Sequence, residues 1–121
     1  MQVVKDSFYA LKDDIFYDVA ERWGKAFAEG DEAALRALAA KARVSLVTPL
    51  REGRLDDLDE ARVRLGELFV ENVVLPVRQG FLSKAVEDFF RLHREIARSN
   101  LKELRGFLQF LIDALCYTGK V

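Results

Sequence analysis

Residues 100–117 read NLKELRGFLQFLIDALCY, and this stretch decides the fold. Its leucines recur at alternating steps of three and four residues, which places them on one stripe of an α-helix. Two phenylalanines and an isoleucine widen that stripe until most of the helix surface is apolar. Because such a helix must be covered on several sides, we expect the rest of the chain to pack around it. The inner stripe consists of Leu101, Leu104, Leu108, Leu111 and Leu115.

The rest of the sequence also predicts helices, since no run shows the period-two alternation of a strand. Gly30 stands where a left-handed helix end is usual, and each proline is expected to break or kink its helix. We find no internal repeat, and residues 50–55 have the composition of an exposed basic loop. The predicted fold is all-α: a single domain over residues 1–121, built as a compact bundle of about five helices. The predicted helices cover about 5–29, 32–47, 56–75, 83–99 and 100–117.

The bulk composition suits one domain with its own core. The chain has 121 residues, of which 50 % are hydrophobic. A single cysteine excludes an internal disulfide and fits a reducing compartment. There is no signal-peptide pattern at the start and no apolar run long enough to span a membrane. We therefore expect a cytoplasmic protein.

The residue types that carry most catalysis are scarce. One histidine and one cysteine cannot form a histidine-based metal cluster or a thiolate metal site, and no Gly-rich phosphate loop occurs. We expect no enzyme activity, no cofactor and no metal. His93 is expected to be a partly buried packing residue, and Cys116 to pack as a small hydrophobic residue. Asp113 lies on the apolar last helix, where it either pairs with an arginine or marks an interface.

The net charge of −1 is distributed in blocks, with a net +4 over residues 36–54 and a net +3 over residues 76–105. In the second basic block, three residues recur at intervals of seven, and a fourth lies three beyond the middle one. All four therefore share one helix face. Such a row can neutralise successive phosphates of a nucleic-acid backbone without reading bases. The row consists of Lys84, Arg91, Arg94 and Arg98.

The same row also has a purely structural interpretation, which the spacing leaves open. Glu87 precedes Arg91 by four residues and Glu95 follows it by four, so these charges can form pairs on a solvated helix face. Arg43, Arg51 and Arg54 offer a second, less regularly spaced basic patch, of which Arg51 and Arg54 are further candidate nucleic-acid contacts.

The first predicted helix carries two adjacent apolar stripes, which is more than one side of a bundle needs. Either this is a central core helix, or one stripe packs on another chain, because aromatic residues are favoured at interface cores. The second case predicts a helical dimerisation or adaptor module with a protein partner and no nucleic acid. A small-molecule pocket between the first and last helices is a weaker option, since no polar constellation supports it. The stripes are Phe8, Leu11, Ile15 and Val19, and Tyr9, Phe16, Ala20, Trp23 and Phe27.

Residues 75–120 combine a Leu-Pro start, an amphipathic helix, and the series Phe107, Phe110, Ala114, Tyr117 and Gly119-Lys120. This segment resembles the C-terminal helix of the small subunit of type III-A CRISPR–Cas effector complexes. The resemblance implies a non-catalytic subunit, copies of which stack beside the backbone subunits and contact the phosphates of the crRNA–target RNA duplex. It implies as partners the other effector-complex subunits, further copies of this chain and the RNA backbone, with no membrane.

Together, these observations predict a non-catalytic small subunit that supports crRNA–target RNA through sequence-independent backbone contacts. The alternative is a dimerisation or adaptor module, for example a homodimer. The expected RNA contacts are Lys84, Arg91, Arg94 and Arg98, followed by Arg51 and Arg54.

Overall fold

The computed structural model describes residues 2–121; it is 72 % helical, and the described residues contain no strand. They form six helices, five of them of seven residues or more, which confirms the all-α class and the expected size of the bundle. Two of these helices contain a wide, π-helical turn (η). The elements are α1 (Asp13–Phe27), α2 (Glu32–Ala42) with η1 (Arg43–Val47) and α3 (Thr48–Arg51), α4 (Leu58–Phe69) with η2 (Val70–Val74) and α5 (Leu75–Arg78), α6 (Lys84–Leu92), α7 (Arg94–Ser99) and α8 (Leu101–Cys116).

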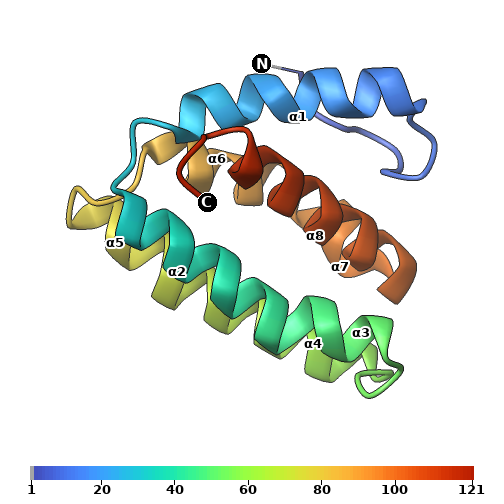
Figure 1. Ribbon diagram of the computed structural model, residues 1–121. Helices are drawn as coiled ribbons and strands as arrows, with labels where there is room; N and C mark the ends of the chain where they lie inside the picture. Colours follow the sequence, from blue (N-terminus) through green and yellow to red (C-terminus); the bar gives the residue numbers. More distant parts are fainter. Residues whose placement is uncertain (1) are drawn as a thin grey trace.

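Helix α8 lies at the centre of the bundle (Figure 1), packed against α1, α7, and α2 with η1. Its start is capped by Asn100, whose side chain accepts a hydrogen bond from the backbone N–H of Glu103 at 2.8 Å. The expectation that the chain packs around this helix is confirmed. Its buried side chains include four of the five predicted stripe residues: Leu104, Leu108, Leu111 and Leu115.

Helix α1 approaches α8 so closely that the contact requires a glycine. A Cβ atom at Gly24 would lie 2.5 Å from the carbonyl oxygen of Ala114 and 2.6 Å from the Cβ of Tyr117. Both distances are shorter than carbon–oxygen or carbon–carbon contacts in close-packed interiors. Around this point, Trp23 and Phe27 are buried and cover the aromatic centre of the bundle.

Residues 2–12 form a non-helical strap, so the prediction of a helix from residue 5 is wrong. The strap is held by Glu103, whose carboxylate accepts hydrogen bonds from the hydroxyl of Ser7 and from the backbone N–H of Phe8. The Phe8 ring is buried against Phe107 and Phe110, at centroid distances of 5.9 and 5.5 Å. These tertiary contacts outweigh the helical spacing of the apolar residues in this segment.

Neither proline ends its helix at the expected place. Pro49 and Pro76 follow the wide turns η1 and η2, in which backbone N–H groups bond five residues back rather than four. A proline normally clashes with the carbonyl four residues before it, and a widened turn relieves that clash. Before Pro49, that carbonyl belongs to Ser45, and it accepts a hydrogen bond from Arg64 Nη1 at 3.0 Å instead.

The two proline-containing helix ends repeat one another, although no repeat was expected from the sequence. Residues 47–55 and 74–82 share the pattern V-x-P-x-R-x-G-x-L. In each copy the proline carbonyl accepts bonds from the two N–H groups five and six residues later. Gly53 and Gly80 have positive φ angles of 72° and 83°, which glycine adopts without strain. These repeats close the two antiparallel arms of the α2–α4 hairpin at opposite ends.

Several local expectations in the loops need correction. Residues 50–55 are not a wholly exposed loop, because Leu50 and Leu55 are buried under the turn. Gly30 does not have a left-handed conformation. It is confined instead by packing, since a Cβ there would lie 3.3 Å from Leu82 Cδ2. Cys116 is exposed rather than packed in the core.

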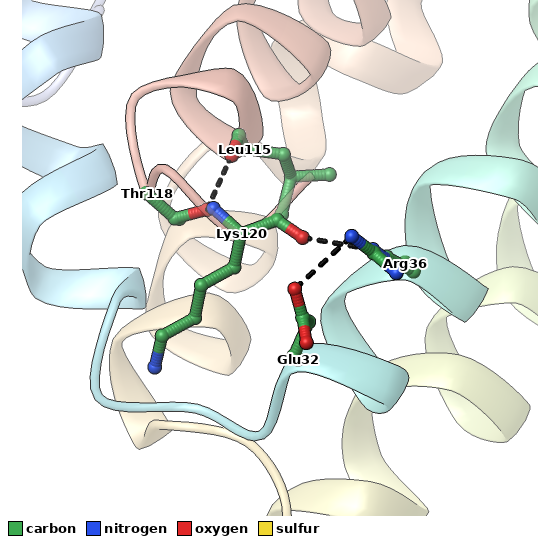
Figure 2. A network of polar contacts seen from close by, with 5 residues as sticks. All are labelled: Glu32, Arg36, Leu115, Thr118 and Lys120. Carbon is green, nitrogen blue, oxygen red and sulfur yellow. Dashed lines mark hydrogen bonds and ion pairs between the residues drawn. The ribbon is translucent and has the colours of Figure 1, made fainter.

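The residues that follow α8 bind the end of α1 and the first turns of α2. Figure 2 shows the Lys120 carbonyl accepting a hydrogen bond from Arg36 Nε at 3.0 Å, while Arg36 also pairs with Glu32. The ammonium of Lys120 donates to the carbonyls of Ala28 and Gly30, at the C-terminal end of α1. A cation is favoured there by the partial negative charge of a helix end. Lys120 therefore has a structural role in holding these helices together.

Among the described residues, Asp113 forms no ion pair with an arginine. Its Oδ1 accepts a hydrogen bond from Gln109 Nε2 at 3.0 Å, and its Oδ2 is buried without a partner in the described chain. Burial raises the pKa of Asp113, and the bond from Gln109 opposes that rise. The alternative that Asp113 marks an interface stays a prediction.

Within residues 2–121, no helix combines the length and apolar character needed to cross a membrane.

The close approach of α1 to α8 predicts opposite effects for two glycine substitutions. Gly24→Ala should lower the free energy of unfolding by about 2 kcal/mol, because the added Cβ overpacks the α1–α8 contact. Gly66→Ala, in open space on α4, should raise it by about 0.5 kcal/mol, because alanine is the better helix former. Urea unfolding followed by Trp23 fluorescence measures both changes. Equal stabilities for the two variants would contradict the packing described here.

Candidate functional site

Helices α6 and α7 place three of the four predicted row residues along one groove. The groove lies between these helices and α4, and has a volume of about 410 Å³. The row is interrupted at His93, where the backbone leaves helical geometry with φ −106° and ψ 9°. The predicted single helix over 83–99 is therefore two helices. The arginines that line the groove are Arg91, Arg94 and Arg98.

The floor of the groove is apolar and largely aromatic. The rings of Phe69 and Phe90 stack, with centroids 5.5 Å apart and planes inclined by 24°. The guanidinium of Arg91 lies 5.1 Å from the centre of the Phe69 ring. On the α4 wall, Gly66 leaves open space where another residue would place a side chain. The floor consists of Leu65, Phe69, Phe90, Ala97 and Phe107.

The charged side chains that line the groove are all positive. None of the residues that line it is acidic. Arg91 pairs with Glu87 at 2.9 Å, which confirms one of the predicted i,i+4 pairs. For Arg94 and Arg98, the described residues provide no carboxylate within ion-pair distance. Two unpaired guanidiniums thus stand beside an apolar hollow, an arrangement that attracts an anion with an apolar part.

The other predicted contacts lie outside this groove. Lys84, at the start of α6, is 4.0 Å from Asp88 and is paired on the helix surface. Arg54 follows the turn at Gly53 and pairs with Glu52 at 2.7 Å. Exposed pairs of this kind contribute little stability and are screened by salt. Their cations are less available to an external anion than Arg94 and Arg98.

Arg51 lines a second, smaller hollow between η1 and α8. This hollow has a volume of about 160 Å³, and it is also lined by Arg105, Tyr9 and Gln109. The sequence alone did not bring Arg51 and Arg105 together, because they lie on helices far apart in the chain. Lys102 does not line this hollow, but its ammonium lies 4.9 Å from the centre of the Tyr9 ring.

His93 packs in the interior as expected, but it is fully rather than partly buried. Its Nε2 accepts a hydrogen bond from the backbone N–H of Val4 at 3.0 Å, and its Nδ1 contacts the carbonyl of Phe89 at 2.7 Å. These contacts fit the neutral ring with its proton on Nδ1. Burial lowers the pKa of His93, and the bond to Phe89 opposes this effect. His93 thus joins the strap to the arginine-bearing helices.

Among residues 2–121, no group of three or more histidine, cysteine, aspartate or glutamate residues is arranged to hold a metal ion. Comparisons with protein-family models, with curated proteins and with solved structures find no match for this chain.

The sequence predicted the arginine row but not the hollow beneath it. The floor residues come from α4, α6, α7 and α8, and each has the periodicity of an ordinary core residue. The one local signal is Gly66, a glycine inside a helix, where alanine would be the more stable residue.

The hydrogen bonds of His93 predict an acid-sensitive fold. In the native state its pKa lies below the ordinary value of 6.5, so the unfolded chain binds a proton more readily. The contribution of His93 to stability is complete above pH 6.5 and falls as pH decreases toward the lowered native pKa. The slope should reach at most about 1.4 kcal/mol per pH unit. Urea unfolding of the wild type and of His93→Phe between about pH 7.5 and pH 5 measures the difference.

The His93→Phe variant serves as its own control for the other titrating groups, because it keeps every carboxylate. It should be less stable than the wild type at neutral pH and should lack the additional acid slope. Parallel pH profiles for the two proteins would contradict the role given to the neutral imidazole.

Proposed function

We propose that this chain is a non-catalytic, RNA-binding small subunit that contacts the phosphate backbone through the groove lined by Arg91, Arg94 and Arg98. The observation that carries this proposal is the one-sided charge of the groove. Two of its three guanidiniums have no carboxylate partner among the described residues, and no acidic side chain lines it. Arginine forks match the geometry of phosphate oxygens, and contacts of this kind position a protein without reading sequence.

The more specific role, small subunit of a type III-A CRISPR–Cas ribonucleoprotein in the cytoplasm, is supported by the resemblance carried by Phe107, Phe110, Ala114 and Tyr117. The first three are buried, so the resemblance concerns the scaffold rather than the contacts. In this role the chain would act beside other subunits and further copies of itself, with no reaction of its own. A sequence without a recognisable catalytic constellation agrees with such a role.

The RNA proposal is tested by removing the two unpaired arginines. Arg94→Ala combined with Arg98→Ala should weaken RNA binding and reduce the slope of log K against log salt by about 1.5, because two phosphate contacts are lost. Fluorescence anisotropy with a labelled RNA over a salt series measures both quantities. Arg91→Ala should have the smaller effect, because Glu87 already neutralises that side chain.

A matched control removes two cations from the outer face of α1. Arg22 and Lys25 pair with residues of their own helix, and Arg22→Ala combined with Lys25→Ala changes the net charge by the same amount. This control should keep the wild-type salt slope. If the two double variants bind RNA identically, the groove is not the RNA site.

A protein-binding adaptor is the second candidate, and one surface favours it. Ile15, Tyr9 and Tyr17 are 40 %, 51 % and 49 % exposed at the beginning of α1 and on the strap. Most of the surplus apolar surface expected on this helix is nevertheless buried, since Trp23 and Phe27 are covered by the core. The exposed remainder is small, which makes the adaptor the second choice.

The adaptor proposal predicts self-association or partner binding through this exposed surface. As a homodimer, the protein should show a concentration-dependent rise in sedimentation coefficient that Tyr17→Glu abolishes, because a charge cannot be buried there without a partner. Glu21→Gln, one helical turn further along, provides an exposed control. A wild-type protein that sediments as a monomer at every concentration would remove the homodimer.

A further inference from the structure

The apolar floor of the arginine groove distinguishes between duplex and single-stranded RNA, whereas the charge of the groove suits both. Contact with a duplex backbone needs only cations at the surface, because the bases remain stacked inside the double helix. A hollow of about 410 Å³ would not be filled by such a duplex, and its apolar lining would stay in water. A single strand differs, because its bases can turn out of the stack and enter an apolar site.

From this geometry we infer that the groove binds single-stranded RNA, with one unstacked base on the floor and the adjoining phosphates on Arg94 and Arg98. This inference rests on the proposed function and specifies the substrate class of the same site. Arg94 and Arg98 are one helical turn apart on α7, roughly 6 Å along its axis. They flank Ala97, a floor residue, so cations and apolar surface belong to one site.

The floor offers both kinds of surface on which bases stack. The Phe69 ring is only partly buried, and the guanidinium of Arg91 lies over it, 5.1 Å from the ring centre, with about half of the Arg91 side chain exposed. Aromatic rings and arginine planes each accept an unstacked base without regard to its identity. The ion pair with Glu87 holds the Arg91 guanidinium in place, so its plane is ordered before RNA arrives.

Gly66 explains how a base could reach this surface. It forms part of the α4 wall, and a side chain at this position would project into open space rather than into protein. The Cβ of a leucine at position 66 would therefore meet no neighbouring atom, and the rest of the side chain would narrow the groove from the α4 wall.

The test compares two RNAs and two leucine variants. One RNA is an oligo-uridine of about 12 nucleotides, and the other is a blunt duplex of the same length. Gly66→Leu should weaken single-strand binding about tenfold, the loss of one stacked base, and leave duplex binding and both salt slopes unchanged. Val63→Leu is the matched control, because Val63 is exposed on the same helix and does not line the groove. It should bind both RNAs as the wild type does.

A second measurement uses only the wild-type protein. A strand of abasic spacers keeps the phosphates of the oligomer and removes its bases. It should bind about tenfold more weakly than oligo-uridine. Uridine monophosphate should bind far more weakly than either strand, because it makes few phosphate contacts. Equal affinity for the abasic strand and oligo-uridine overturns the inference, as does a mononucleotide that binds as tightly as the oligomer.

The two proposals fail in different ways. If Arg94→Ala with Arg98→Ala weakens binding of both RNAs while Gly66→Leu changes neither, RNA binding stands and the single-strand inference is wrong. If the arginine variant leaves both RNAs unaffected, the proposed function is wrong, and the inference fails with it. Circular dichroism melting of each variant shows whether a loss reflects unfolding.

Discussion

The bundle depends on how closely α1 can approach α8. Helix α8 is apolar over most of its surface and is covered from several sides, and α1 supplies the cover on one of them. That cover is complete only because Gly24 places no side chain between its helix and the carbonyl of Ala114. With the two helices in contact, Trp23 reaches the aromatic centre, where its ring lies 5.3 Å from that of Phe89.

Two polar side chains then connect this core to the arginine groove. Glu103 and His93 hold the strap by its backbone N–H groups, which would otherwise be buried without partners. His93 is also the residue at which α6 ends and α7 begins, between two of the arginines. The orientation of the groove wall therefore depends on a neutral imidazole whose hydrogen bonds are made to the strap and to α6.

Periodicity was sufficient for the elements that behave as isolated amphipathic helices. Four of the five leucines in the predicted α8 stripe are buried, because leucines that repeat at helical spacing indicate one buried helix face. The strap was mistaken for helix, since Phe8 has helical spacing but is buried through tertiary contacts with Phe107 and Phe110. For the two prolines the error was the reverse, because a helix was predicted to end where it continues. A wide turn before each proline relieves the clash that normally ends a helix.

The candidate site was only half predictable for a related reason. Charge spacing identifies Arg91, Arg94 and Arg98, which line one groove although the break at His93 divides them between α6 and α7. Whether a cation is free or paired depends on rotamers, and Lys84 and Arg54 prove to be paired. The hollow depends on where α4 lies relative to α6 and α7, and no local pattern in the sequence specifies that distance.

The most direct test of the proposed site is to map where RNA contacts the folded protein. Titration of the labelled protein with oligo-uridine, followed by NMR, reports on each backbone amide and methyl group. We predict that the largest shifts occur at Gly66, Phe69 and Ala97 and at the Nε–H groups of Arg94 and Arg98. Largest shifts around Tyr9 and Arg51, or on the outer face of α1, would contradict the assignment of RNA binding to the arginine groove.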